Sequence, residues 1–201
     1  MENELTFRII TIVLFIVVVA TGIYHRVRAA RSGEKISRRE EGVPIMIVLR
    51  LFGFSTWIGL LIYMINPQWM VWSTLLLPSW LRWVGAGFGT VALPLIDWMF
   101  SSLGRNVTDT VVIRKEHSLV IRGPYRWIRH PMYSFSFLIV IGVSLLAANW
   151  FIGLTGILAL ILLIVRTPIE EAKLIEAFGD EYREYMKRTG RFLPRLIVSR
   201  E

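Results

Sequence analysis

The 201 residues contain no cysteine, which excludes both a disulfide framework and a thiolate metal site. Histidine is scarce as well: His25, His117 and His130 stand far apart and follow no metal-ligand spacing, so we expect no metal. Acidic residues are outnumbered, and the net charge is +8. Because the positive residues fall between apolar runs rather than along one face, we expect no nucleic-acid partner and interpret the charge as a signal of membrane orientation.

Long polar stretches are also rare, since 54% of the residues are hydrophobic. The chain is too short for several domains and too apolar for a soluble one. Apolar runs cover residues 5–24, 45–65, 81–103, 132–146 and 150–165. The last two are shorter than the roughly 20 residues of an ideal span, so we expect them to tilt little or to lie partly in the interface. The prediction is an all-α, polytopic bundle of about five transmembrane helices, surrounded by membrane lipids.

The first run could be a signal peptide, but it begins after the acidic stretch Met1–Glu4 and no small-residue cleavage site follows, so we expect it to be retained. Lys and Arg cluster in residues 25–43, 104–130 and 166–201, and they are absent from 66–80 and 147–149. This alternation predicts a multi-pass protein with its N-terminus outside and its C-terminus in the cytoplasm.

Several small features refine the bundle. Gly85, Gly87 and Gly89 would let the third helix approach a neighbour closely, and Pro94 would kink it. Ala147-Ala148-Asn149 is long enough only for a helical hairpin turn. Residues 168–187 have the apolar spacing of a cytoplasmic amphipathic segment, which Gly179 would interrupt with Asp180 as a new N-cap.

A polar cluster opens the fourth run, at Arg129-His130-Pro131-Met132-Tyr133. Pro131 suits the first helical position, and the helix start then offers free N–H groups to an anionic part of a ligand. His130 and Tyr133 could both reach that ligand. The alternative is an interfacial anchor, since Arg, His, Tyr and Trp are common at bilayer edges.

A second polar cluster, Arg166 to Glu171, closes the hairpin about thirty residues later and returns to the same membrane face. Arg166 and Glu170 have the spacing of one helical face, but Pro168 favours a kink or a fresh helix start, with Glu170 and Glu171 in its first turn. The alternative is a plain surface ion pair. Upstream, residues 117–120 and 123–125 suggest an extended piece and a turn.

Taken together, the stretches 123–133, 166–174 and 178–185 closely resemble the isoprenylcysteine carboxyl methyltransferase family, in particular its prokaryotic integral-membrane branch. The resemblance covers about the second half of the chain. It implies a single integral-membrane domain over residues 1–201, with three membrane helices in 1–103 and a cofactor-binding catalytic half in 104–201. One departure is Phe135, where many members have glycine, and this affects the expected shape of the acceptor pocket.

The resemblance also implies S-adenosylmethionine as cofactor, in a pocket that the C-terminal segment closes on the cytoplasmic side. Arg166 matches the arginine that holds the acceptor carboxylate and is the predicted catalytic residue. The implied cofactor contacts are His117, Ser118, Leu119, Val120, Tyr125, His130, Pro131, Met132, Tyr133 and Glu170.

The implied reaction methylates the α-carboxylate of a prenylated cysteine or a similar lipidic acceptor. A carboxylate is ionised at neutral pH, so the reaction needs alignment and dehydration rather than a general base. Three alternatives remain open. They are a methyltransferase acting on a phospholipid amine, small thiol or small acid; a non-catalytic membrane scaffold; and a sterol-reductase-like protein, which shares a similar histidine-proline-tyrosine element.

Overall fold

The computed structural model describes residues 4–30, 43–104 and 119–195, and this part of the chain is helical with no strand. The long helices are α1 (Glu4–Ala30), α2 (Val43–Ile65), α3 (Ser79–Leu103), α4 (Pro131–Ala147) and α5 (Trp150–Phe178). Short elements are the 3₁₀ helices η1 (Pro67–Ser73) and η3 (Gly123–Arg126) and the helix α6 (Asp180–Arg188). The predicted all-α membrane bundle is therefore confirmed.

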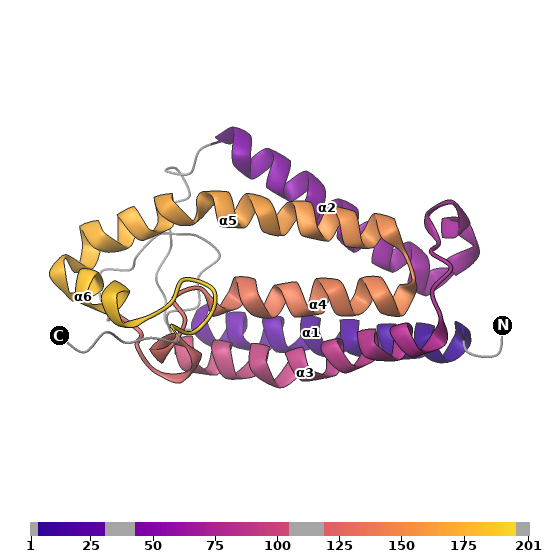
Figure 1. Cartoon of the computed structure of the whole chain (residues 1–201), viewed down its shortest axis with the longest axis horizontal. Coiled ribbons are helices and arrows are strands. Elements are labelled where there is room, and N and C mark those ends of the chain that lie inside the picture. The colour runs from indigo at the N-terminus through magenta and orange to yellow at the C-terminus, as the bar shows by residue number, and fades with distance from the viewer. Residues whose placement is uncertain (1–3, 31–42, 105–118, 196–201) are drawn as a thin grey trace.

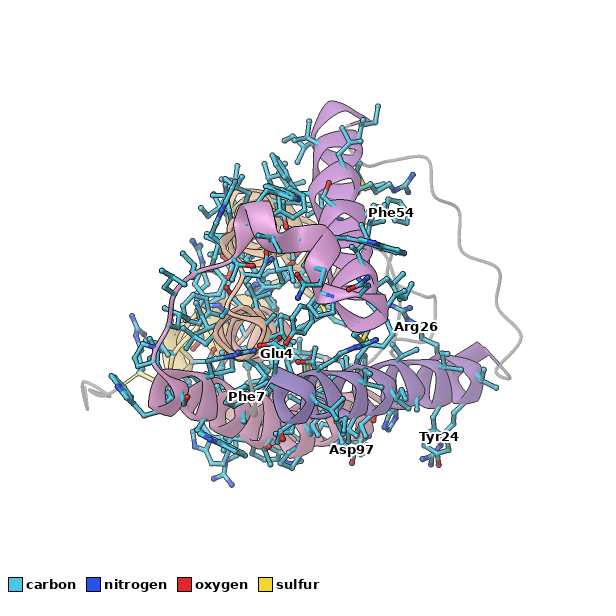
Figure 2. The ribbon with its side chains drawn as sticks, turned by 90° about the vertical axis from the view of Figure 1, so that its right-hand side faces the viewer. Glu4, Phe7, Tyr24, Arg26, Phe54 and Asp97 are labelled. Carbon is cyan, nitrogen blue, oxygen red and sulfur yellow. The ribbon has the colours of Figure 1, made fainter. Side chains whose placement is uncertain are left out.

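Four of these helices, α1, α2, α3 and α5, are long and apolar enough to cross a membrane. The fifth, α4, is apolar but has only 17 residues. Consecutive helices run in opposite directions along the long axis, and α4 lies in the middle of the bundle, between α3 and α5 (Figures 1 and 2). The ends of α1, α3 and α5 and the start of α4 consequently gather at the end of the molecule that carries α6, which we call the α6 end.

Helices α3 and α4 touch backbone to backbone. A Cβ atom on Gly85 would lie 2.7 Å from the carbonyl oxygen of Gly142, and one on Gly142 would lie 2.8 Å from the amide nitrogen of Gly89. The prediction of close approach is thus confirmed for Gly85 and Gly89, but it is wrong for Gly87, beside which there is open space. This contact fixes α4 along α3 and so sets where the polar start of α4 lies.

The predicted hairpin turn between α4 and α5 is confirmed. Ala148 takes the left-handed conformation (φ 48°), and the Asn149 side chain caps α5 by accepting a hydrogen bond from the Ile152 amide (3.1 Å). Asn149 also donates to Ser73 Oγ (2.8 Å), which ties the turn to η1. Because this turn is so short, α5 runs directly back toward the α6 end.

Helix α5 continues through Pro168, so the expected fresh helix start at that residue is wrong, and Glu170 and Glu171 do not lie in a first turn. An interior proline costs about 3 kcal/mol in an isolated helix. In a bundle, contacts of the following turn offset that cost. Gly179 does end the helix, with φ 56°, but it caps both α5 and α6, and Asp180 is the first residue of α6 rather than its cap.

At the end opposite α6, a polar group ties four helices together. Arg82 of α3 donates to Glu4 Oε2 of α1 (2.5 Å), to the Tyr63 hydroxyl of α2 (3.2 Å) and to the Leu146 carbonyl of α4 (2.9 Å). Tyr63 in turn donates to Glu4 Oε1 (2.9 Å). Figure 2 looks along the bundle from this end and shows Glu4 pointing toward the centre. We call Glu4, Tyr63 and Arg82 the Arg82 group.

Candidate active site

The start of α4 brings together most of the residues singled out by the sequence. His130 is the N-cap residue and Pro131 occupies the first turn, as predicted. The imidazole of His130 stacks on the Tyr133 ring, with centroids 5.4 Å apart and planes 6° from parallel. Pro131 and Tyr133 are buried, whereas the Met132 side chain is 42% exposed. The helix start therefore presents His130 and Tyr133 to one side and leaves Met132 outside.

Helix α5 supplies the acidic partner. The Tyr133 hydroxyl donates a 2.6 Å hydrogen bond to Glu170 Oε2, and His130 Nδ1 lies 3.7 Å from the same oxygen. Arg166 Nε lies 3.7 Å from Glu170 Oε1, one helical turn away, so the two residues share one face of the continuous helix, as their spacing allowed. Arg166 also approaches the Met46 sulfur of α2. We call His130, Tyr133, Arg166 and Glu170 the Glu170 group.

The next residue of α5 organises a second polar cluster. Glu171 is buried, and its Oε1 accepts from Arg129 Nε (2.8 Å) while its Oε2 accepts from Arg191 (2.5 Å). Arg129 also donates to the carbonyls of Met186 (3.0 Å) and Thr189 (2.5 Å). We call Arg129, Glu171 and Arg191 the Glu171 group; it joins α5, the start of α4 and the segment after α6.

The sequence did not assign roles to this second cluster. Arg129 and Glu171 lie inside the motifs noted above, but nothing local pairs residues 42 positions apart. One signal was available: adjacent carboxylates on a helix point about 100° apart, so Glu170 and Glu171 must face different neighbours. Arg191 carried no signal, because it lies beyond the helical pattern of α6.

The C-terminal segment closes over the start of α4. The backbone of Gly190 bonds to Trp127 (3.0 Å) and Arg129 (2.9 Å), and the His130 amide donates to the Arg191 carbonyl (3.0 Å). Ser134 Oγ donates to the Phe192 carbonyl (2.5 Å), and the Phe192 ring lies 6.0 Å from the His130 ring. The amphipathic face of α6 is buried through Tyr182 and Tyr185, and the Tyr185 hydroxyl donates to the Tyr125 carbonyl (2.6 Å).

Burial controls the charge of His130. Its side chain is 9% exposed, and loss of solvation lowers its pKa to about 4, although nearby Glu171 opposes that shift. The imidazole is therefore neutral at pH 7. Burial likewise raises the pKa of Tyr125, Tyr182 and Tyr185, so these phenols stay protonated and act as neutral hydrogen-bonding groups.

Two polar atoms in this region lack a hydrogen-bond partner among the described residues. They are Nε2 of His130 and the hydroxyl of Tyr182, and both are buried. His130 Nε2 lies 3.4 Å from Glu171 Oε1, close enough for attraction but without hydrogen-bond alignment. Buried polar atoms are normally paired, and an unpaired one points to a group that binds there.

The remaining predicted contacts divide into three sets. His117 and Ser118 lie outside the described residues. Leu119 and Val120 are half-buried and precede η3. The Tyr125 ring packs with the α3–α4 core of Ala92, Ile96, Met99 and Phe135, and it lies within electrostatic range of Tyr133. Phe135 thus faces α3, away from Arg166 and Glu170 on α5.

Among the described residues, no group of three or more His, Asp and Glu side chains could hold a metal ion. What the structure does gather is a neutral stacked His–Tyr pair, two carboxylates of α5 and three arginines, at one end of a membrane bundle. Such a set can accept hydrogen bonds and contact a cation through Glu170 and the Tyr133 ring, and it can grip an anion through Arg166.

Comparisons with known proteins show what the chain is similar to. A family model described as the isoprenylcysteine carboxyl methyltransferase (ICMT) family matches residues 86–176. The human protein-S-isoprenylcysteine O-methyltransferase is 38% identical over 99 residues, 48% of this chain and 34% of its own length. The chain therefore spans about a third of that relative.

Two further similarities extend over more of the chain. Methanethiol S-methyltransferase of Pseudomonas deceptionensis is 29% identical over 185 residues, 87% of this chain and 69% of its own length. A solved structure of the eukaryotic intramembrane Ras methyltransferase ICMT superposes with a TM-score of 0.54 at 21% identity, covering 96% of this chain and 70% of that one, which shows a shared fold. The family model, the named relatives and the fold agree: the chain is similar to the isoprenylcysteine carboxyl methyltransferase family over residues 86–176 and shares the fold of an intramembrane methyltransferase of that family.

Proposed function

We propose that the protein transfers a methyl group from S-adenosylmethionine to an acceptor at the Glu170 group, and that the acceptor is the carboxylate of a prenylated cysteine or a similar lipidic acid. One observation carries the proposal. The Tyr133–Glu170 hydrogen bond of 2.6 Å joins the start of α4 to α5 beneath the C-terminal segment, beside a buried His130 with an unpaired nitrogen.

The residues present fit such a cofactor. Glu170 can accept hydrogen bonds from hydroxyl or ammonium groups, and it is 14% exposed, so those bonds would form away from bulk water. His130 Nε2 and the Tyr182 hydroxyl are unpaired atoms for a polar ligand to satisfy. The Tyr133 ring can stabilise a positively charged sulfur through its face.

When bound, the cofactor supplies the methyl carbon, which forms a bond to the acceptor oxygen as its bond to sulfur breaks and the electron pair stays on sulfur. The protein's part is orientation and exclusion of water. Arg166 lies on the α2-facing side of the site, next to Met46, and its guanidinium can grip and aim an acceptor carboxylate. We assign Arg166 orientation rather than activation, because a tighter grip would weaken the nucleophile.

A small thiol is the second candidate acceptor, favoured by the alignment with methanethiol S-methyltransferase over 87% of this chain. A thiol must lose its proton before it attacks, because a cysteine thiol has a pKa near 8.5 and simple alkyl thiols are weaker acids still. His130, with a pKa of about 4, is too weak a base to hold that proton, so the thiolate forms by losing its proton to solvent, whereas a carboxylate acceptor needs no base. Turnover of a thiol should therefore fall with decreasing pH below about 8, and turnover of a carboxylate should hold to about pH 5.

The test uses full-length protein in detergent. Isothermal titration calorimetry measures S-adenosylmethionine binding, and the same preparation is then assayed with a farnesylated cysteine analogue and with methanethiol. Binding with carboxyl methylation supports the proposal, and turnover of the thiol alone establishes the second candidate. Absence of binding in a folded sample would overturn both and favour a scaffold.

Arg166→Ala separates the two acceptors. We expect carboxyl methylation to fall at least about 100-fold while cofactor affinity is largely kept, because the variant removes the acceptor's anchor. Thiol methylation should change little. Unaltered carboxyl methylation in this variant would exclude Arg166 as the carboxylate clamp. Arg183→Ala is the matched control, since Arg183 forms an exposed pair with Asp180 on α6.

A further inference from the structure

A second ionisable pair lies outside the candidate active site, between α1 and α3. His25 Nε2 lies 2.9 Å from Asp97 Oδ1. The His25 side chain is 3% exposed and its ring stacks on Phe100, at 5.5 Å and 18°. The Asp97 side chain, in contrast, is 60% exposed. The pair therefore joins two helices on its inner side and presents a carboxylate on its outer side.

The position of Asp97 makes that exposure unusual. Both residues belong to helices that are long and apolar enough to cross a membrane. Asp97 comes six residues before the end of α3 at Leu103, which is about 9 Å along the axis, so it lies toward a membrane surface rather than the midplane. A carboxylate on a lipid-facing helix is costly without a partner. Among the described residues, His25 is its one partner and bonds one of its two oxygens.

The surroundings indicate which partner fits. Tyr24 is 60% exposed, and its ring meets the His25 ring edge-on at 5.0 Å. Figure 2 shows Tyr24 and Asp97 on the same outer side of the α1–α3 pair. Arg28 is exposed and lies one turn after Tyr24 on the same face of α1. The surface formed by Tyr24, Arg28 and Asp97 thus offers an anion, an aromatic face and a cation near the ends of α1 and α3.

We propose that this surface binds the headgroup of a phospholipid that carries an ammonium group, of the phosphatidylethanolamine class. The ammonium donates to the free oxygen of Asp97 beside the Tyr24 ring, and the phosphate meets Arg28. A purely anionic headgroup would be repelled by Asp97, so charge complementarity selects a zwitterionic one. The site is independent of methyl transfer, since it lies on α1 and α3 rather than on α4 and α5.

The test is native mass spectrometry of the full chain in detergent, titrated separately with phosphatidylethanolamine and phosphatidylglycerol. Asp97→Asn is the informative variant, because it keeps an oxygen that can accept the His25 hydrogen bond and removes only the charge. We expect the wild type to prefer phosphatidylethanolamine, and the variant to bind it at least about fivefold more weakly with no loss of phosphatidylglycerol binding. Asp180→Asn removes an exposed charge of α6 and should change neither.

His25→Phe distinguishes a lipid site from a simple helix–helix contact. It removes the hydrogen bond and keeps the carboxylate, so we expect a lower melting temperature with the lipid preference retained. Three results would overturn the proposal: equal binding of both lipids by the wild type, an unchanged preference in Asp97→Asn, or a dimer that Asp97→Asn dissociates. The last would assign the surface to a second copy of the chain.

Discussion

The two ends of the bundle carry polar groups of similar composition and opposite character. The Arg82 group, with Glu4 and Tyr63, is fully paired: its guanidinium, hydroxyl and both carboxylate oxygens all have partners from α1, α2, α3 or α4. At the α6 end, the Glu170 and Glu171 groups contain more charged side chains, yet a buried nitrogen of His130 and the hydroxyl of nearby Tyr182 have no hydrogen-bond partner in the described part of the chain.

The Arg82 group holds helices together, whereas the groups at the α6 end have polar atoms available to bind a ligand. The Arg82 group links helices that already pack along their length, and every hydrogen bond serves that packing. At the α6 end, a few ion pairs and backbone hydrogen bonds instead hold a short C-terminal segment over the start of α4. Two buried polar atoms there remain without a hydrogen bond. Substitutions in the Arg82 group should consequently lower stability without weakening ligand binding, whereas substitutions in the Glu170 group should weaken ligand binding.

The largest effect is expected for Glu171→Ala. Arg129 has a side chain only 9% exposed and would remain as an uncompensated buried charge, which costs about 3–5 kcal/mol. We expect a sharply lower unfolding midpoint, measured by thermal or denaturant unfolding in detergent, and release of residues 186–195, measured by hydrogen exchange. Glu184→Ala removes an exposed carboxylate of α6 paired with Lys187 and should shift the midpoint little. Equal shifts in the two variants would contradict the role of the Glu171 group.

Next in size is the pH dependence contributed by His130. Its pKa is about 4 in the folded protein and about 6.5 in the unfolded chain, so between these values the unfolded state binds more protons. Stability from this group is complete above pH 6.5 and falls as the pH drops toward 4, by up to about 3 kcal/mol. His130→Gln should flatten unfolding curves over that window, whereas His25→Phe at the pair between α1 and α3 should leave this His130-dependent slope in place. A slope unchanged by His130→Gln would refute the assignment.

A smaller effect is expected at the opposite end. Tyr63→Phe removes one hydroxyl that bonds both Glu4 and Arg82, and the loss should cost about 1–2 kcal/mol. Because this end is about the length of the bundle away from Glu170, we expect the dissociation constant for S-adenosylmethionine to stay within about twofold of the wild type. A cofactor affinity that fell with Tyr63→Phe would show that the two ends are coupled.

The sequence predicted those parts of the fold that local patterns encode. Apolar run lengths placed all five long helices, the three residues 147–149 allowed one kind of turn, and Pro131 marked the first turn of α4. Pro168 misled, because a proline ends an isolated helix, whereas Glu170 and Glu171 make tertiary contacts that hold α5 together beyond it. The prediction that Gly87 lies against a neighbouring helix was wrong because spacing alone does not tell which glycines face a neighbour.

The candidate site was predictable to the extent that its residues lie in motifs. His130, Tyr133 and Glu170 come together as the resemblance implied, and Arg166 joins them. Membership of the Glu171 group was not predictable, since the pairing of Arg129 and Arg191 with Glu171 depends on how the C-terminal segment crosses the start of α4. The exposure of Met132 was not predictable either, since the motif alone does not tell which of its residues point outward.

The central claim is that the Glu170 group, and not polar groups elsewhere in the bundle, binds the methyl donor. The most direct measurement is calorimetric titration of S-adenosylmethionine into the wild type, Glu170→Ala and Glu4→Gln, each in the same detergent and each shown to be folded. We predict a dissociation constant at least about tenfold weaker for Glu170→Ala, because a buried carboxylate acceptor is lost, and an unchanged one for Glu4→Gln. Equal dissociation constants for the wild type and Glu170→Ala would contradict the assignment of the site.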